Sequence, residues 1–332
     1  MSTDLRHMRA FIAVAEERHF GRAARRLSIT QPPLSQQIRA LEESVGALLF
    51  ARTRRSVQLT PVGRELLVEV RRIVAMADAL PPLAQSLARG ERGMLSLAFV
   101  STADYGLLPP LLRAFGARFP QVRLQLTEAT SDVQSVEILA GRIDAGLAIP
   151  PLTPLPPESS PVVDATNPAA RAPGLSYRPL FREPLIVAMS TQVAASLHAA
   201  ADLAGRGASQ AVDLRALADL PLIIFPRRLA PAFHDLITGS YTQAGLVPRI
   251  AQEAIQMQTI VSLVSAGLGI ALVPRSLKNL RRTGVVYRPL AGALPAVETG
   301  VVWRSDDASP VLRGFLDVAE QTAATLKAGR RA

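Results

Sequence analysis

The sequence predicts an α/β protein with an all-α N-terminal part, and three observations support this fold class. Before residue 46, apolar residues recur at helical spacing and are interrupted by short polar turns. From residue 94 onward, apolar runs typical of buried strands alternate with amphipathic stretches, an order typical of parallel sheets covered by helices. The length of 332 residues exceeds one domain of about 100–200 residues, so we expect two or three compact units.

Composition excludes several classes of protein. Hydrophobic residues make up 48% of the chain and charged residues 19%, which is enough apolar material to bury several cores and argues against disorder. Cysteine is absent, so disulfide frameworks, thiolate metal sites and cysteine nucleophiles are excluded, and the histidines are scattered singly. We therefore expect no cofactor and no metal. The N-terminus lacks an apolar signal segment and no apolar run is long enough to cross a bilayer, which predicts a cytoplasmic protein without membrane contact.

The positive charge is concentrated at the N-terminal end. The net charge is +10, and residues 1–60 hold ten Arg against five acidic residues, so half of the excess lies in less than a fifth of the chain. This distribution predicts a polyanionic partner. All but two of the cations are Arg, which suits bidentate contacts with phosphate and guanine but is equally explained by the base composition of the genome.

The N-terminal part is predicted to contain three short helices and a hairpin. Residues 4–17 and 21–27 form the first two helices, and Ser28 ends the second. Thr30 is a suitable N-cap for a third helix with Pro32 in its first turn, and Gly46 ends that helix. On a helical wheel one face of the third helix is apolar and the opposite face is polar. Residues 51–60 then predict a two-stranded wing with a basic tip.

A longer helix is expected from Pro61. Its apolar residues are spaced alternately four and three positions apart, which is a short heptad pattern and predicts pairing with a second helix. These residues are Leu66, Val70, Ile73, Ala77 and Leu80. Pro81 and Pro82 predict a kink or a new helix before Gly90.

A helix, a tight turn, a second helix and a basic hairpin together favour DNA recognition. The second helix of such a pair lies in the major groove, where Gln bonds adenine, Arg bonds guanine and Ser bonds base edges or phosphate. The candidate DNA-binding residues are Arg22, Thr30, Gln31, Pro32, Ser35, Gln36, Arg39, Arg52, Arg54 and Arg55. The alternative is an ordinary small helical bundle with a solvated polar face.

The rest of the chain predicts two α/β series. In the first, strands at 95–100, 122–127 and 143–149 alternate with helices at 107–119 and 131–140 and predict a parallel sheet. Residues 150–174 contain eight prolines and predict an irregular surface loop. In the second, strands are expected near 185–189, 222–225, 249–252 and 270–273, helices near 230–244 and 254–266, and a flexible excursion at 199–211.

These segments carry a family resemblance that covers nearly the whole chain. The winged helix-turn-helix of LysR-type transcriptional regulators is similar to FIAVAEERHFGRAARRLSITQPPLSQQIRALEESVGALLFARTRRSVQLTPVGRELL, although Thr30 stands where the family commonly has Ser. The effector-binding region of that family resembles GRIDAGLAI, DLPLIIFP, AGLVPRIAQEA and VSAGLGIALVP, which occur in the expected order.

The resemblance implies a domain organisation. Residues 1–60 correspond to the DNA-binding domain and 61–93 to a linker helix, through which subunits dimerise, and a hinge. Residues 94–320 correspond to two Rossmann-like α/β subdomains resembling type 2 periplasmic binding proteins. One subdomain comprises 94–150 plus about 267–320, and the other about 175–266. Residues 321–332 are left as a C-terminal tail.

The resemblance also implies an effector cleft between the subdomains. Its residues correspond to Ser101, Thr102, Thr130, Ser131, Phe225 and Pro226. Helix N-termini favour carboxylates, and ligands of parallel sheets bind beyond the carboxyl ends of strands, so the physical chemistry agrees with this placement. Taken singly, each Ser or Thr is explained as a helix N-cap; their convergence from both subdomains favours a site. We expect the effector to be a small organic acid, either aromatic or aliphatic.

The sequence therefore predicts an effector-responsive transcription factor and no enzyme. No G-x-S-x-G turn, Walker A loop or zinc spacing occurs. The expected partners are double-stranded promoter DNA, the effector, further copies of the chain in a dimer or tetramer, and RNA polymerase. The alternative is a small-molecule binding protein or enzyme whose first 90 residues serve only for oligomerisation.

Overall fold

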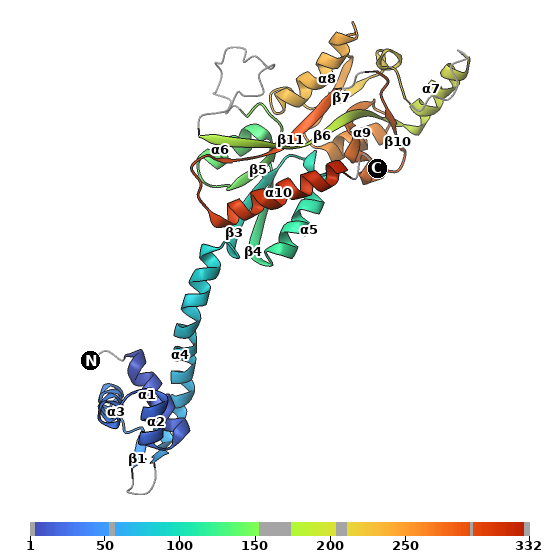
Figure 1. The fold of residues 1–332 in the computed structure, drawn as a ribbon. Helices are drawn as coiled ribbons and strands as arrows, with labels where there is room; N and C mark the ends of the chain where they lie inside the picture. The colour runs from blue at the N-terminus through green and yellow to red at the C-terminus, as the bar shows by residue number, and fades with distance from the viewer. Residues whose placement is uncertain (1–3, 53–56, 153–173, 204–210, 293–294, 329–332) are drawn as a thin grey trace. The chain divides into compact units, whose positions relative to one another are not determined.

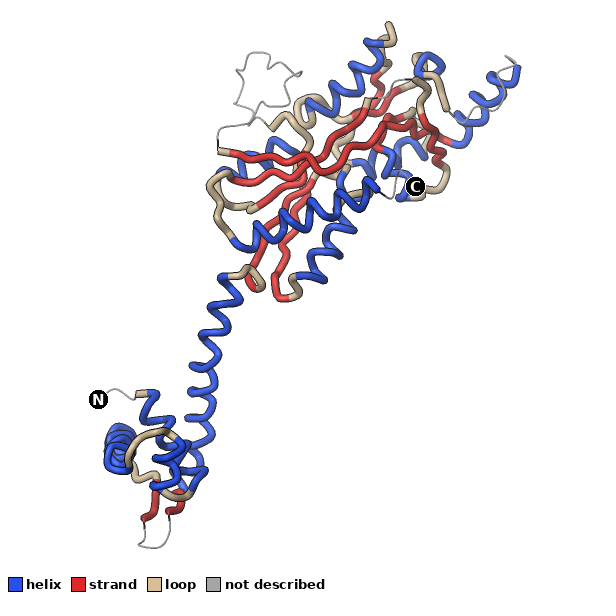
Figure 2. Tube along the Cα trace, viewed as in Figure 1, coloured by secondary structure: helices blue, strands red, loops and turns tan. Residues whose placement is uncertain are grey.

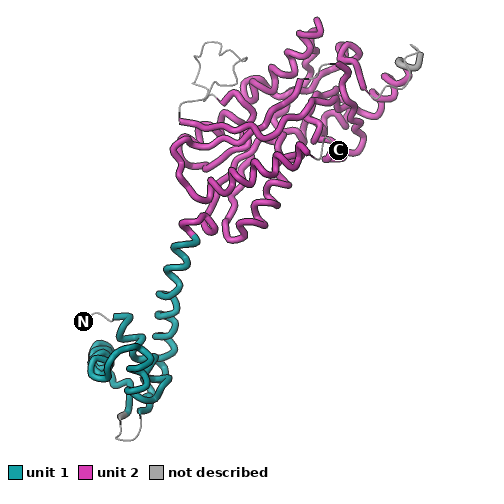
Figure 3. The backbone as a smooth tube through the Cα atoms, in the orientation of Figure 1, with its two compact units in different colours: residues 1–86 teal, residues 87–332 magenta. Residues whose placement is uncertain are grey.

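The computed structural model describes residues 4–52, 57–152, 174–203, 211–292 and 295–328. The chain divides into two compact units, Met1–Ser86 and Leu87–Ala332 (Figure 3). The predicted tip of the wing and most of the proline-rich segment lie outside the described residues.

The first unit is helical with a small hairpin. It contains α1 (Leu5–Glu17), α2 (Phe20–Arg26), α3 (Gln31–Val45), the antiparallel pair β1 (Phe50–Arg52) and β2 (Val57–Leu59), and α4 (Pro61–Ala88) (Figure 1). The predicted helices and the two-stranded wing are therefore confirmed. The apolar stripe of α3, formed by Leu34, Ile38 and Leu41, is buried in one core with Phe11 and Phe50.

The long helix α4 differs from the prediction. It continues through Pro81 and Pro82 to Ala88, so the expectation of a new helix before Gly90 is wrong. Each proline removes one backbone hydrogen bond, but the flanking segments are rich in Ala and Leu, which have high helix propensity and continue the helix on both sides. At its start, Gly63 lies so close to Leu49, the residue before β1, that a Cβ atom would come to 2.2 Å from the Leu49 carbonyl oxygen.

The second unit is built on a seven-stranded sheet, and Figure 2 draws its strands in red. The strand order is β10-β6-β11-β5-β3-β4, and β9 also pairs with β6. The parallel part matches the prediction and comprises β3 (Arg92–Phe99), β4 (Gln121–Glu128) and β5 (Ala145–Ala148). The antiparallel part comprises β6 (Leu175–Ser190), β9 (Ala271–Pro274), β10 (Val285–Pro289) and β11 (Ala296–Arg304). A separate parallel pair is formed by β7 (Leu222–Ile224) and β8 (Ile250–Glu253).

Helices cover these strands. The unit has two lobes, each with its own hydrophobic core. The first lobe has α5 (Leu108–Arg118), α6 (Ser131–Leu139) and α10 (Pro310–Ala328), and its main core includes Phe115 and Phe315. Helices α5 and α10 lie side by side (Figure 1). The second lobe has α7 (Thr191–Leu203), α8 (Pro231–Gln243) and α9 (Met257–Ser265), and its core includes Phe233 and Val261. Three short 3₁₀ helices complete the described elements: η1 (Ala103–Tyr105), η2 (Leu214–Leu217) and η3 (Arg275–Leu280).

Two long neighbouring strands, β6 and β11, connect the lobes. Phe181 of β6 and Val301 of β11 belong to the core of the first lobe, whereas Val187 and Val297 of the same strands belong to the core of the second. Near this crossing Glu183 of β6 is buried, and its carboxylate accepts hydrogen bonds from the backbone N–H and the hydroxyl of Ser276 at 2.7 and 2.9 Å.

This crossing corrects the predicted subdomain boundaries. Residues 267–290 were expected in the first subdomain, but β9 and β10 pair with the second half of β6 and pack into the second lobe. The first half of β6 conversely belongs to the first lobe. Residues 321–328 are no tail, because they continue α10 and bury Ala323. Residues 199–203 are likewise helical, as part of α7.

No helix in the described part of the chain is long and apolar enough to cross a membrane.

Candidate functional sites

Local hydrogen bonds place α3 within the first unit. The imidazole Nδ1 of His19 accepts hydrogen bonds from the N–H groups of Gly21 and Arg22 and caps α2. After α2, Ser28 has a positive φ of 53°, and the Ile29 N–H donates to the Ala24 carbonyl. This tight turn leads directly into α3, whose apolar stripe then packs against α1 and α2.

The predicted DNA-contacting side chains on α3 share its solvent side. Gln31, Pro32, Gln36 and Arg39 are exposed and Ser35 is half-buried; we call these five residues the α3 face. The first turn of α3 contains no acidic residue. Thr30 occupies the N-cap position, as predicted, but its hydroxyl makes no capping hydrogen bond. That hydroxyl is exposed beside the α3 face.

Several cations near α3 are held by acids of the same unit. Arg22 donates to the Glu17 carbonyl oxygen, and its Nε lies 3.5 Å from the Glu17 carboxylate. Glu16 binds both Arg26 and Arg71 at 2.7 Å, and these hydrogen bonds, Arg71 first, lower the pKa of the Glu16 carboxyl. Arg39, by contrast, has no ion pair with any residue that the structure describes. The side chain of Arg52, and all of Arg54 and Arg55, lie outside the described residues.

Sequence reasoning missed the role of Glu42. This residue of α3 is only 7% exposed, and its carboxylate accepts hydrogen bonds from the backbone N–H groups of Leu49 and Phe50 at 2.9 and 3.2 Å. It thereby ties the end of α3 to the first strand of the wing. The signal was its wheel position, beside the apolar stripe rather than opposite it.

The predicted dimerisation residues on α4 divide into two groups. Leu66 and Val70 pack into the core of their own unit, so the structure contradicts a contact of Val70 with a second copy. Ile73 and Leu80 are 44% and 61% exposed, and Ala77 is half-buried. The exposed apolar row is instead continued by Met76, between Ile73 and Leu80. The first residues of the heptad pattern therefore pack within the unit, and pairing of α4 through the remaining ones stays a prediction.

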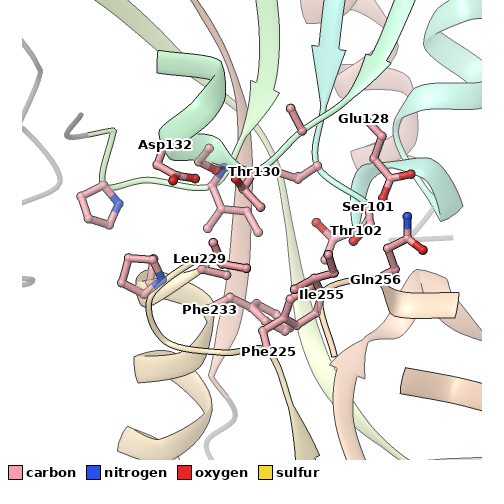
Figure 4. Close-up of a pocket in the computed structure, with 18 residues that line it drawn as sticks. Ser101, Thr102, Glu128, Thr130, Asp132, Phe225, Leu229, Phe233, Ile255 and Gln256 are labelled. Atoms are coloured by element: carbon pink, nitrogen blue, oxygen red, sulfur yellow. Dashed lines mark hydrogen bonds between the residues drawn. The ribbon is translucent and has the colours of Figure 1, made fainter. Parts of the chain in front are cut away.

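A pocket of about 360 Å³ lies between the two lobes of the second unit (Figure 4). The predicted effector residues Ser101, Thr102, Thr130, Ser131 and Phe225 all line it, although they come from three distant segments of the chain. Pro226 does not line the pocket, which corrects that prediction. Its carbonyl oxygen accepts hydrogen bonds from Leu229 and Ala230, and this turn places Leu229 against the pocket instead.

The polar atoms of the first-lobe wall differ in their partners. Thr102 is 6% exposed, and its hydroxyl has no hydrogen-bond partner among the described residues. The Ser131 hydroxyl, in contrast, accepts a hydrogen bond from the Ile149 N–H at 3.0 Å. Thr130 stands at the N-cap of α6 without a capping side-chain hydrogen bond.

Two carboxylates that sequence reasoning missed also line this wall, Glu128 at the end of β4 and Asp132 in the first turn of α6. Burial raises the pKa of the Glu128 carboxyl, and the nearby charge of Asp104 adds to this effect. The described lining residues include no Lys, Arg or His. The family resemblance pointed to Thr130, and the rule that ligands bind beyond the ends of parallel strands, which agrees with Thr130, also points to these acids.

The chain belongs to the LysR family of transcriptional regulators. Residues 5–64 match the family described as "Bacterial regulatory helix-turn-helix protein, lysR family", and residues 88–324 match "LysR substrate binding domain". It is therefore a LysR-type regulator with a DNA-binding helix-turn-helix domain and an effector-binding domain.

Individual relatives agree along nearly the full length. The chain is 52% identical over 313 residues to the HTH-type transcriptional regulator IlvR of Caulobacter vibrioides, covering 94% of this chain and 96% of the relative. It is 36% identical to AlsR of Bacillus subtilis, with 95% of each chain covered. Among solved structures, full-length CbnR complexed with its target DNA matches with a TM-score of 0.78 and 29% identity, over 96% of this chain and 99% of CbnR.

Proposed function

We propose that this regulator binds promoter DNA through the α3 face and the wing, and that a small organic effector in the pocket controls that binding. Gln31, Gln36 and Arg39 would contact base edges, with Ser35 and Thr30 on base edges or phosphate. Arg22, Arg52, Arg54 and Arg55 would contact phosphate or enter a minor groove. The observation that carries the proposal is the exposure of this polar helix side in a chain that also holds a concave site with an unpaired hydroxyl.

The pocket supports control by a population shift. Its walls come from both lobes, and β6 and β11 are the strands that cross between them. An effector with a carboxylate and an apolar body would contact both walls and favour one angle of lobe closure over another. The free energy that couples the effector to DNA binding is limited by the difference between its binding free energies for the two angles of lobe closure.

Assembly would use the exposed apolar row of α4, because Ile73, Met76 and Leu80 follow coiled-coil spacing. We propose homodimers that pair into tetramers, with RNA polymerase as a further partner at the promoter. A regulator that binds promoter DNA acts in the compartment that holds the DNA, which in the bacterial relatives is the cytoplasm.

A binding assay on the full chain tests this proposal. We expect retention of a DNA fragment from upstream of its own or the neighbouring gene, in preference to a scrambled fragment of equal length. The double variant Gln36→Ala, Arg39→Ala should lose this preference. Arg113→Ala, which removes an exposed cation of α5 in the second unit, is the matched control and should retain it. If the first unit serves only for oligomerisation, neither fragment is retained at moderate salt, and the proposal fails.

A further inference from the structure

The two walls of the pocket differ in polarity. Figure 4 shows Ser101, Thr102, Glu128 and Asp132 on the first-lobe side and Leu229, Phe233 and Phe225 on the second-lobe side. The first wall therefore presents hydroxyls and carboxylates, and the second presents mainly apolar side chains.

The carboxylates of the first wall have no cationic partner among the described lining residues. The Thr102 hydroxyl and the Asp132 Oδ1 atom are buried and have no hydrogen-bond partner among the described residues. Buried polar atoms without partners cost free energy, and the cost is larger for a charged group. No cation of the described lining faces Glu128 or Asp132. An ammonium group has three donors and a positive charge, so it would pair with Glu128 and Asp132 and donate to the Thr102 hydroxyl, whereas the two carboxylates would repel an anion.

The second wall provides the complementary site. Helix α8 borders the pocket through Ala232 of its first turn and α9 through its N-cap residue Gln256, and neither helix has an acidic residue in its first turn or a side-chain cap. Their N–H groups and helix dipoles therefore favour an anion. Helix α6 on the opposite wall differs, because Asp132 in its first turn already offsets its dipole.

Between these polar ends the pocket is apolar and small. Phe225 and Phe233 pack edge to face, with ring centroids 5.5 Å apart, and Leu229 and Ile255 lie beside them. The volume of about 360 Å³ is near the lower end of the roughly 300–1,000 Å³ of small-molecule sites.

We infer that the effector is a zwitterion, an α-amino acid with an apolar side chain, with its ammonium group on Glu128, Asp132 and Thr102 and its carboxylate on the N-termini of α8 and α9. The inference rests on the proposed effector role of the pocket and changes the predicted organic acid by adding a cationic group. It also moves the carboxylate from the α6 N-terminus to the second lobe. A ligand with both charges bridges the lobes, whereas a simple acid or amine satisfies only one wall.

Matched ligands test the inference by calorimetric titration of the full chain. The probes are leucine and phenylalanine, their deaminated acids 4-methylpentanoate and 3-phenylpropanoate, and their decarboxylated amines 3-methylbutylamine and 2-phenylethylamine. We expect at least one amino acid to bind about tenfold or more tightly than both of its analogues, the size expected of a charge-assisted hydrogen bond.

Isosteric variants locate the ammonium group. Glu128→Gln and Asp132→Asn should weaken the amino acid about tenfold and leave the deaminated acid equal or tighter, because they remove only negative charge. Asp317→Asn, at an exposed acid of α10, is the matched control and should bind the amino acid unchanged. Circular dichroism melts of each variant establish that it is folded.

The outcomes separate this inference from the proposed function. If a deaminated acid binds as tightly as its amino acid, or if no probe binds, the zwitterion inference is overturned, while retention of the promoter fragment still supports the proposed DNA binding. If the fragment is not retained, the proposed function fails whichever probe binds.

Discussion

The α3 face and the effector pocket differ in shape, in charge and in how the chain assembles them. The α3 face is exposed, carries Arg39 without an internal ion pair among the described residues, and comes from nine consecutive residues. The pocket is concave, carries Glu128 and Asp132 without a described cation, and draws on distant segments of the chain. DNA would thus be held by exposed charge that salt screens, and the effector by buried groups that salt hardly reaches.

The largest expected effect is the contrast in salt dependence. Between 50 and 200 mM salt, promoter affinity should fall by about 10³-fold or more, the loss expected for about six phosphate contacts. Affinity for the best amino acid probe should change by less than about twofold, because buried charges are screened weakly. Fluorescence anisotropy with labelled promoter DNA measures how DNA affinity changes with salt concentration, and calorimetry measures the same dependence for the amino acid. Equal salt dependences would contradict the distinction between the two surfaces.

Glu42→Ala should produce the next largest effect, on the stability of the first unit. It leaves the buried N–H groups of Leu49 and Phe50 without their acceptor, so we expect the free energy of unfolding to fall by about 2–3 kcal/mol. Urea unfolding followed by circular dichroism measures the change. Glu43→Ala, the exposed neighbour, is the control and should shift stability by less than about 0.5 kcal/mol. Similar losses for both variants would mean that the Glu42 hydrogen bonds contribute nothing specific.

Glu42 also shows how far sequence reasoning reaches. The elements of the first unit were predicted well because helical periodicity and turn residues are local signals. A wheel also separates the two sides of α3, yet it cannot show that Glu42 meets the wing strand, since that contact depends on the packed turn between them. Val70 illustrates the same limit, because only the packed unit shows that this part of the α4 pattern is already buried.

The second unit was predicted less completely for a related reason. The parallel strands β3, β4 and β5 follow the local alternation of strand and helix, whereas β10, β11 and the crossing of β6 depend on pairing between residues distant in the sequence. In the pocket, the family resemblance assigned Ser101 and Thr130, and both line the pocket in the structure. Glu128 and Asp132, each two residues from Thr130, went unnoticed because an anionic effector gave no reason to look for acids.

Thr102→Val tests whether the unpaired hydroxyl serves the ligand rather than the fold. The change keeps the side-chain shape, so the free chain should be equally or slightly more stable, while affinity for the best amino acid probe falls about tenfold. Thermal melts with and without the probe report both quantities, because a ligand stabilises the folded chain in proportion to its binding. Thr325→Val on α10 is the control and should leave the affinity unchanged. A loss of stability without a loss of affinity would show that the hydroxyl is structural.

The smallest effect is expected at Glu16, which joins α1 to Arg26 of α2 and Arg71 of α4 on the exposed side of the first unit. The two Arg side chains lower the pKa of this carboxyl, so the stabilisation is present above its ordinary value of 4.5 and is lost as the pH falls through the lowered pKa. Because the pairs are exposed, Glu16→Gln should cost less than about 1 kcal/mol at pH 7. When urea unfolding is measured at several pH values, the difference in free energy of unfolding between Glu16→Gln and the parent chain should vanish at the most acidic pH. A difference that persisted there would mean that Glu16 acts through packing rather than charge.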